Sequence, residues 1–215
     1  MFDPALRKIK NLALGPPARA MGHVSPGLLT ALGFGAGAGA GVLAWKGRLQ
    51  WALVLWLANR ILDGLDGVVA HLHGKSSDLG GLFDLVADFA VYAAIPLALA
   101  LRPGADPALP GAAALLLGVF YVNAAAWMVP AAILERRGRG VDERGEATSV
   151  VIPEGLISGG ETVLFYTLFF LLPDRQVVLF RVMAALTAVT VVQRLVWAAF
   201  AFRGPKARNP ANPEP

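Results

Sequence analysis

Residues 80–101 read GGLFDLVADFAVYAAIPLALAL, an apolar run interrupted by two aspartates. Roughly 20 consecutive apolar residues are needed for an α-helix to cross a bilayer. A soluble domain has about 25% charged and about 45–50% apolar residues, whereas this chain has 16% charged and 56% hydrophobic residues. The stretch therefore predicts a membrane helix, and the composition indicates that others surround it.

Comparable apolar runs lie on both sides of this stretch. They occupy residues 26–45, 49–71, 109–134, 156–173 and 176–202. Glycine, proline and charged residues separate the runs, as expected at turns. We therefore predict an all-α integral membrane protein with six transmembrane helices, in which residues 1–203 form a single domain and residues 26–202 form the bundle.

The two ends of the chain have a different composition. In residues 1–22, Phe2, Leu6 and Ile9 recur at helical spacing opposite the basic Arg7 and Lys8. This pattern predicts an amphipathic helix lying at the membrane interface, although an ordinary basic flank remains an alternative. The stretch lacks an uninterrupted apolar core followed by a cleavage site, so we do not expect a signal peptide. The Pro- and Asn-rich tail, residues 204–215, is expected to be disordered.

The basic residues give the orientation. An even number of spans places both termini on one side, and basic residues concentrate on the cytoplasmic side of membrane proteins. With the termini inside, the lysines and arginines outside the spans fall mostly on that side, and the exceptions are Lys46, Arg48, Arg102 and Arg175. We therefore predict cytoplasmic termini in a bacterial-type inner membrane.

Charge and cysteine content exclude several classes of function. The net charge is +4, and it reflects this one-sided distribution, so nucleic acid is not an expected partner. The absence of cysteine excludes disulfides, thiolate nucleophiles and cysteine-ligated metals. In the first span, Gly33, Gly37 and Gly41 follow at four-residue spacing, which predicts close helix packing.

Four aspartates stand where carboxylates are costly. Asp63 and Asp66 end the second span, and Asp84 and Asp88 open the third. Spacings of three and four residues place each pair on one helix face, and the short turn between the spans brings the pairs to one depth near the cytoplasmic surface. An ionised Asp at the centre of a membrane helix costs about 2.5–3.5 kcal/mol.

Three explanations account for this cluster. Basic partners would neutralise it, but these two helices offer only Arg60 nearby. A proton relay seldom needs four carboxylates so close together. Divalent cations explain the cluster best, because two of them offset four negative charges and all-oxygen ligation suits Mg²⁺ or Mn²⁺. Glycines beside the ligands, Gly67 and Gly80, let a phosphate approach the backbone, and paired metals suit phosphoryl transfer.

The same residues resemble a family signature. The chain reads Asp63-x2-Asp66-Gly67-x2-Ala70-His71-x8-Gly80-x3-Asp84-x3-Asp88. It is similar to the motif D-x2-D-G-x2-A-R-x8-G-x3-D-x3-D of CDP-alcohol phosphotransferases, and the six-span layout extends the resemblance over nearly the whole chain. The stretch from Ser25 to Thr30 also resembles the opening of the first helix in this family.

The resemblance implies a function and a set of site residues. Family members are homodimers that transfer a phosphatidyl group from CDP-diacylglycerol, or another CDP-alcohol, to a small alcohol and release CMP in phospholipid synthesis. The implied metal ligands for two Mg²⁺ ions, with Mn²⁺ as the alternative, are Asp63, Asp66, Asp84 and Asp88. Asp88 is also the implied catalytic base. The implied donor-binding residues are Pro26, Gly27, Thr30, Gly67, Ala70, His71, Ser77 and Gly80.

One position departs from the signature. His71 stands where the family has an arginine that is expected to contact the donor. Histidine has a shorter reach and no fixed charge at neutral pH. Either His71 makes a weaker contact with help from His73 and Lys75, or it only ends the helix. Zinc binding by His71 and His73 has no obvious partner set.

The acceptor site is the least defined part of the prediction. Its candidates lie near the cytoplasmic ends of the later helices, and they are Asn123, Arg136, Arg137, Glu154, Glu161, Thr162, Arg181 and Arg194. Among these we select Glu161, Thr162, Arg181 and Arg194. Relatives that take a phosphorylated alcohol tend to carry a basic residue early in the fifth helix, where this chain has Glu161. A neutral or cationic alcohol is therefore favoured, unless Glu161 pairs with Arg181 or Arg194.

Two functions of other classes remain open at this stage. A membrane carrier would use the Asp cluster to bind ions, but the chain lacks the inverted repeats with interrupted helices that many carriers have. An inactive scaffold would be consistent with the departure at His71. The sequence does not name the acceptor, the acyl chains, or whether the donor is a lipid.

Overall fold

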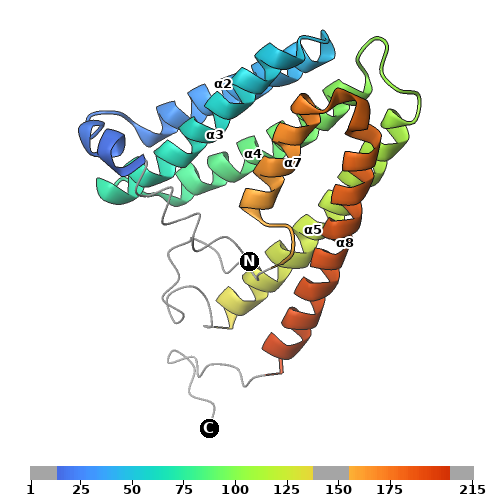
Figure 1. Ribbon diagram of the computed structural model, residues 1–215. Helices are drawn as coiled ribbons and strands as arrows, with labels where there is room; N and C mark the ends of the chain where they lie inside the picture. The colour runs from blue at the N-terminus through green and yellow to red at the C-terminus, as the bar shows by residue number, and fades with distance from the viewer. Residues whose placement is uncertain (1–13, 138–154, 204–215) are drawn as a thin grey trace.

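The computed structural model describes residues 14–137 and 155–203, and this part of the chain is helical with turns between the helices. Residues 14–20 form a short helix. The long helices are α2 (Pro26–Trp45), α3 (Leu49–Leu72), α4 (Asp78–Ala100), α5 (Leu109–Arg136), α7 (Gly159–Leu171) and α8 (Gln176–Ala201), with a single turn η1 (Pro173–Arg175) before α8. Figure 1 shows α2, α3 and α4 gathered on one side, α5 paired with α8 on the other, and α7 between them.

Glycines on one face of α2 let it pack closely against α3 and α4. Gly33, Gly37 and Gly41 are all buried, as the four-residue spacing predicted. A Cβ built on Gly37 would lie 2.4 Å from a methyl carbon of Val91 on α4 and 3.1 Å from the amide nitrogen of Asn59 on α3. Only glycine fits at this distance, so α2 holds α3 and α4 in place on either side of it.

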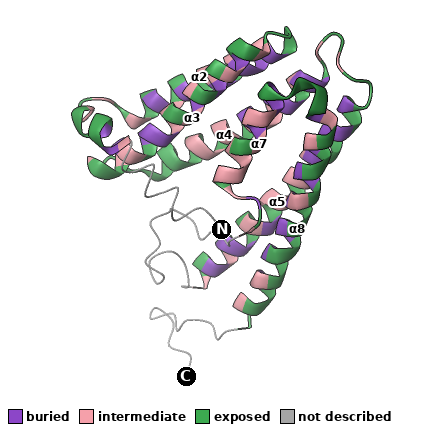
Figure 2. Ribbon diagram, in the orientation of Figure 1, coloured by how far each residue is buried: buried purple, intermediate pink, exposed green. Residues whose placement is uncertain are grey.

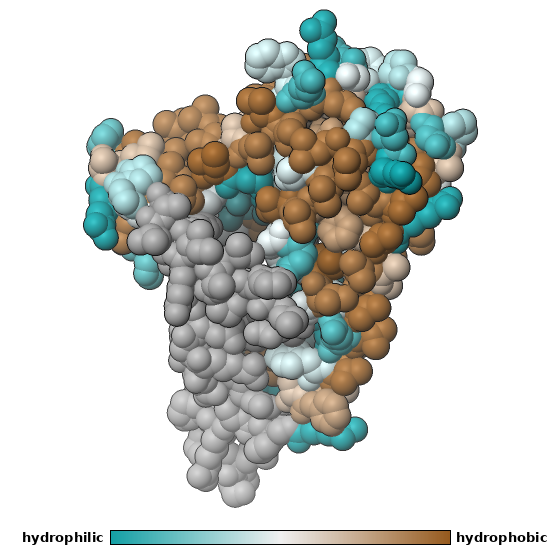
Figure 3. All heavy atoms as spheres, in the orientation of Figure 1, coloured by the Kyte–Doolittle hydropathy of each residue, from teal (hydrophilic) through white to brown (hydrophobic). Residues whose placement is uncertain are grey.

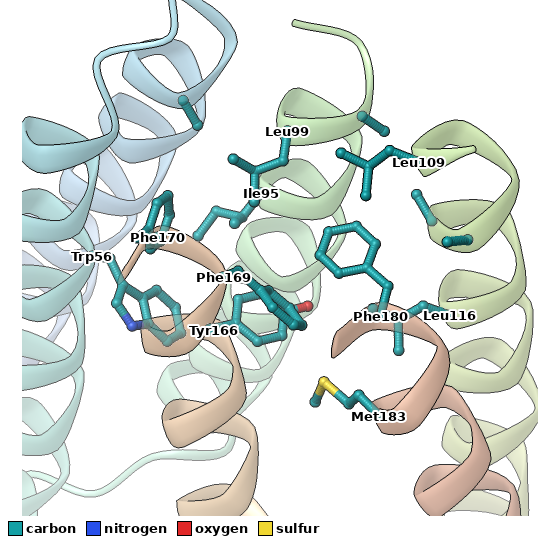
Figure 4. Close-up of a cluster of buried hydrophobic side chains, with 14 of the residues drawn as sticks. Trp56, Ile95, Leu99, Leu109, Leu116, Tyr166, Phe169, Phe170, Phe180 and Met183 are labelled. Atoms are coloured by element: carbon teal, nitrogen blue, oxygen red, sulfur yellow. The ribbon is translucent and has the colours of Figure 1, made fainter. Parts of the chain in front are cut away.

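Aromatic side chains of α7 form the centre of the apolar core. Figure 4 shows Tyr166 and Phe169 of α7 among Trp56 from α3, Ile95 from α4 and Phe180 from α8. The ring of Trp56 stacks on that of Tyr166 at 5.1 Å between centroids, and Phe169 meets Phe180 at 4.4 Å. The core therefore joins the two sides of the bundle through α7.

The segment before α7 is held by side chains of α8. The backbone amide of Leu156 donates to Gln193 Oε1 (2.9 Å), and that of Ile157 donates to Thr190 Oγ1 (2.8 Å). A Cβ on Gly155 would lie 2.2 Å from the Thr190 methyl carbon, so this residue must be glycine for the approach to occur. Gln193 and Thr190 thus accept hydrogen bonds from two backbone amides that lie outside a helix and have no helical partner.

The fifth predicted span is shorter in the structure than the sequence indicated. We expected a helix over 156–173, whereas α7 has 13 residues and begins at Gly159. Ser158 and Glu161 form a capping box: the Ser158 amide donates to Glu161 Oε2 (3.1 Å), and the Ser158 hydroxyl bonds the same oxygen. Ser-x-x-Glu before an apolar run is a helix-start signal, and it marks the start of α7 where the apolar run alone does not.

The other predicted spans agree with helices to within two residues at each end, and their outer surface is apolar. Figure 2 shows exposed residues facing outward along the helices, and Figure 3 shows hydrophobic side chains over much of the visible face. Among the described residues, four helical stretches are long and apolar enough to cross a membrane: Pro26–Trp45, Asp78–Ala100, Leu109–Arg136 and Pro173–Ala201. At 24 residues α3 has the length, but it carries the charged residues Arg60, Asp63 and Asp66. α7 would extend about 20 Å, less than the roughly 30 Å of a hydrocarbon core.

Two predictions about the chain ends fall largely outside the described residues. Residues 1–13 of the expected interfacial helix and the tail 204–215 are not described. The described remainder of the N-terminal segment, helix 14–20, packs through Ala18 and Leu14 beside Leu29, Leu65 and Val69. This small cluster attaches the segment to α2 and α3.

Replacing Gly37 with alanine should destabilise the protein by about 1–3 kcal/mol, because the new methyl group overpacks the contact with Val91. Thermal unfolding in detergent measures the change. Gly35→Ala is the matched control, since a Cβ at Gly35 meets nothing within 4 Å. Equal unfolding temperatures for the two variants would contradict the packing of α2 described above.

Candidate active site

The four aspartates of the sequence motif line one small cavity between α2, α3 and α4. Its volume is about 10 Å³, and its lining residues are Thr30, Gly33, Phe34, Asn59, Asp63, Asp66, Asp84, Ala87 and Asp88. A volume near this value holds about one water molecule. The prediction that both Asp pairs meet at one depth is therefore consistent with the geometry of the cavity.

Asp66 is the most deeply placed of the four carboxylates. Its residue is 4% exposed, and the Thr30 hydroxyl of α2 donates a hydrogen bond to its Oδ2 at 2.7 Å. Thr30 Oγ1 also lies 3.1 Å from the carbonyl oxygen of Pro26, one turn earlier. The start of α2, which Pro26 favours as a first helical residue, thus orients one carboxylate of α3.

Arg60 bridges the two helices that carry the aspartates. Its Nη2 donates to Asp88 Oδ1 at 2.7 Å, and its Nη1 lies 3.6 Å from Asp63 Oδ2. The arginine side chain is 9% exposed. The sequence predicted Arg60 only as a counter-charge too small to neutralise four aspartates. Its i,i+3 spacing from Asp63 is the feature of the sequence that indicated their contact.

The donors of this cavity fit a hard divalent cation by their chemistry. Carboxylate oxygens are the ligands that Mg²⁺ and Mn²⁺ prefer, and all four line the same cavity. Within residues 14–137 and 155–203, no three acidic or histidine side chains converge on one point as a ready-made metal site. Ligation therefore requires the carboxylates to draw together around the ion, and Asp63, Asp66, Asp84 and Asp88 are the residues that would hold it.

The residues predicted to bind the donor lie at the same end of three helices. Pro26, Gly27 and Thr30 are in the first turns of α2, and the last turns of α3 contain Gly67, Ala70 and His71. Ser77 caps α4 by accepting a hydrogen bond from the Gly80 amide at 3.1 Å. A Cβ on Gly67 would meet nothing within 4 Å, so the backbone beside Asp66 faces open space.

The basic residues near His71 contact the N-terminal segment. His73 Nε2 lies 3.0 Å from the Ala18 carbonyl oxygen, and Lys75 Nζ donates to the carbonyl oxygens of Gly22 (2.7 Å) and Val24 (3.2 Å). His71 itself is exposed. In this arrangement His73 and Lys75 hold the turn between α3 and α4 against residues 18–24.

The predicted acceptor residues are spread over three helices. Glu161 and Thr162 belong to the first turn of α7, where Glu161 accepts the capping bonds and the Thr162 hydroxyl donates to the Ser158 carbonyl oxygen at 2.8 Å. Arg194 on α8 is 5% exposed and donates to Asn123 Oδ1 on α5 at 2.8 Å. The sequence left open an ion pair between Glu161 and Arg181 or Arg194, but it does not form in the structure. Among the described residues, the ion pairs join Arg60 to Asp63 and to Asp88.

The remaining acceptor candidates lie elsewhere. Arg136 and Arg181 are exposed. Arg137 donates to the Phe202 carbonyl oxygen at 3.0 Å and thereby links the ends of α5 and α8. Glu154 lies outside the described residues.

Comparison with known proteins identifies the family. A sequence model of the CDP-alcohol phosphatidyltransferases matches residues 23–192, which include the three helices that line the cavity. The chain belongs to this family. Inner membrane protein YnjF of Escherichia coli strain K12 is 33% identical over 178 residues, which are 82% of this chain and 84% of that protein.

Solved structures of one enzyme have a similar fold. Phosphatidylinositol phosphate synthase PgsA1 of Mycobacterium tuberculosis, in complex with manganese and citrate, matches with a TM-score of 0.65 and 21% identity over 86% of this chain and 88% of that chain. The same enzyme with CDP-DAG bound matches with a TM-score of 0.65 and 20% identity over 86% and 92% of the two chains. At these identities the likeness shows the fold alone.

Replacing Thr30 with valine should lower stability by about 1.5–3 kcal/mol, the range for hydrogen bonds to charged groups, because Asp66 loses its donor. Unfolding temperatures of purified protein measure the loss. Thr30→Ser keeps the hydroxyl and serves as the control. If Thr30→Val unfolds no earlier than Thr30→Ser, the bond to Asp66 contributes nothing.

Proposed function

We propose that this protein is a divalent-metal-dependent CDP-alcohol phosphatidyltransferase that moves a phosphatidyl group from CDP-diacylglycerol to an alcohol and releases CMP. One observation carries the proposal: the four aspartates of the family signature line a single cavity in a chain that belongs to the family. The manganese and CDP-DAG complexes of the M. tuberculosis enzyme are consistent with this assignment.

The metal ligands in this proposal are Asp63, Asp66, Asp84 and Asp88, which would hold two Mg²⁺ ions, or Mn²⁺ in their place. When bound, the ions polarise the phosphate oxygens and offset the charge of the departing CMP. Thr30 keeps the Asp66 carboxylate oriented through its 2.7 Å hydrogen bond. The start of α2 thus contributes to the site although it carries none of the aspartates.

Asp88 is the proposed general base. Its carboxylate accepts the proton of the acceptor hydroxyl while that oxygen bonds to the phosphorus attached to the diacylglycerol. The bond from this phosphorus to the oxygen bridging the two phosphates breaks, and CMP leaves with the electron pair. The products are a phosphatidyl alcohol and CMP.

The donor site in this proposal is the common end of α2, α3 and α4. Gly67 leaves the backbone open to the diphosphate of the donor. Gly80, whose amide donates to the Ser77 hydroxyl, lies beside it, and Pro26, Gly27, Thr30, Ala70 and Ser77 surround the cytidine. His71 takes the place of the family arginine beside them. Because His73 and Lys75 are bonded to the N-terminal segment, His71 acts there without their help.

The acceptor in this proposal is an alcohol without a phosphate group. Relatives that take a phosphorylated alcohol tend to carry a basic residue early in the fifth helix, whereas the first turn of α7 has Glu161, which accepts the capping bonds from Ser158. The charged residues that line the cavity are all acidic, but the proposed metals offset their charge, so the argument for a neutral or cationic acceptor rests on α7.

The proposed setting is the inner membrane, as the name of the E. coli relative states for that protein. We propose that α3 and α7 complete a six-span bundle with the four apolar helices, and that helix 14–20 lies along the cytoplasmic surface. Both termini and the active site then face the cytoplasm, and the protein functions as a homodimer.

Replacing Asp88 with asparagine should reduce CMP release by about 10²–10⁴-fold, because the amide cannot accept the proton of the hydroxyl. CMP formed from radiolabelled CDP-diacylglycerol measures the rate. Chelation of divalent metal should abolish release by the unmodified protein. Asp78→Asn is the matched control, since Asp78 is an exposed residue of the same helix outside the cavity. Full activity of Asp88→Asn would exclude Asp88 as the base.

Replacing His71 with arginine should lower the KM for CDP-diacylglycerol, because a guanidinium binds a phosphate with a fixed charge and two donors. His71→Ala should raise it if the imidazole makes a weaker form of that contact. Initial rates over a range of donor concentrations give both values. No change in either variant would show that residue 71 does not contact the donor.

The acceptor is found by supplying purified protein with radiolabelled CDP-diacylglycerol and a panel of alcohols, and identifying the lipid formed. A carrier would instead take up ions or protons into vesicles without producing CMP. An inactive scaffold would do neither. Both outcomes would overturn the proposed function.

A further inference from the structure

Arg60 has more directed contacts than a simple counter-charge needs. Its Nε donates to Asn59 Oδ1 at 2.8 Å, its Nη1 to the Tyr92 hydroxyl at 2.7 Å, and its Nη2 to Asp88 Oδ1 at 2.7 Å. All three nitrogens of the guanidinium therefore have an oxygen partner. A planar fork bonded on every side has its orientation fixed.

Aromatic rings enclose the same guanidinium. Its Cζ lies 4.9 Å from the Trp56 ring centroid and 5.0 Å from that of Tyr92. The two rings meet edge-on at 6.1 Å, and both pack on Tyr166 of α7. Cation–π contacts of this kind stabilise an arginine away from water.

Each support of Arg60 is itself anchored to another helix. Asn59 Nδ2 donates to the Gly33 carbonyl oxygen on α2 at 2.9 Å. The Tyr166 hydroxyl donates to the Tyr92 carbonyl oxygen, and Trp56 Nε1 donates to Thr167 Oγ1 at 3.1 Å. Three neighbouring helices thus determine where the guanidinium of α3 points.

We infer that Arg60 is a positioning residue for Asp88. The bond to Oδ1 holds the Asp88 carboxylate of α4, and the same guanidinium lies 3.6 Å from Asp63 of α3. Without it, two carboxylates of like charge would repel each other, and Asp88 would lose its fixed orientation. This inference rests on the proposed function for the part in which Asp88 is the base.

Arg60→Lys separates orientation from charge. Lysine keeps the positive charge but loses the planar fork that bonds Asp88 and Tyr92 together. We expect kcat for CMP release to fall by about 10- to 100-fold, the usual effect of losing a partner that orients a metal-site residue, while the KM for CDP-diacylglycerol stays unchanged. An unchanged kcat, or a rise in KM that accompanies the fall in kcat, would overturn the inference.

A double-mutant cycle tests whether Tyr92 acts through Arg60. Tyr92→Phe removes the hydroxyl that accepts from Arg60 and should reduce kcat in the same direction. The same substitution should have no further effect in the Arg60→Lys protein, because the fork is already lost. Tyr121→Phe is the control, since Tyr121 is 81% exposed. Additive effects of the two changes would contradict the inference.

Direct Mn²⁺ binding to the purified protein gives a readout that does not depend on turnover. Arg60→Lys keeps the positive charge beside Asp63 and Asp88 but loses the fork that orients Asp88, so the Mn²⁺ dissociation constant should rise about 10- to 100-fold. An unchanged or lower dissociation constant overturns the inference, and equal unfolding temperatures of the variant and the unmodified protein show that the effect is not a loss of fold. If the unmodified protein releases no CMP, the proposed function fails, and the position of Arg60 is then decided by this Mn²⁺ measurement alone.

Discussion

Lipid offers no hydrogen bonds, and this constraint accounts for the arrangement of the polar groups in this bundle. Asp66 receives a hydroxyl from α2, and Asp88 receives a guanidinium from α3. That guanidinium is in turn held by Asn59, Tyr92 and Trp56. Asp66, Asp88 and Arg60 thus each have a hydrogen-bond partner on a neighbouring helix, and these pairs fix how the helices meet.

Close packing by α2 makes these pairings available. Thr30 reaches Asp66, and Gly33 offers its carbonyl oxygen to Asn59, because the buried glycine face brings the α2 backbone against α3 and α4. A Cβ at Gly37 would clash with Val91 of α4. Thr30 of the site and the packing glycines Gly33 and Gly37 therefore lie along one face of α2 and depend on each other.

Much of the fold and part of the site could be predicted from the sequence, for identifiable reasons. Helix ends followed the limits of apolar runs, so five helices were placed to within two residues. The start of α7 was missed because it depends on a local cap at Ser158 and Glu161 and not on hydropathy. Apolar length also overstated the length of that helix, because residues 156–158 lie before its first turn.

The aspartates could be placed together because their spacing and the short turn leave few alternatives. The role of Arg60 could not be predicted, since it depends on Asp88 and Tyr92 of α4, which lie 28 and 32 residues further along the sequence. The partners of His73 and Lys75 could not be predicted either, because they are backbone carbonyl oxygens, which every residue has. The acceptor site stays a proposal for a related reason: its candidates are long polar side chains whose directions the sequence does not encode.

The attachment of residues 155–158 to α8 has a consequence for biosynthesis. α7 is too short to cross the hydrocarbon core unaided, and the amides of Leu156 and Ile157 are bonded to Gln193 and Thr190. The ribosome makes these two side chains more than thirty residues later than the amides that they bond. While the chain is growing, the amides have no such partner until most of α8 has been made. The bonds that hold the start of α7 can therefore form only after α8 has been made, so α7 reaches its final place later than its position in the sequence would imply.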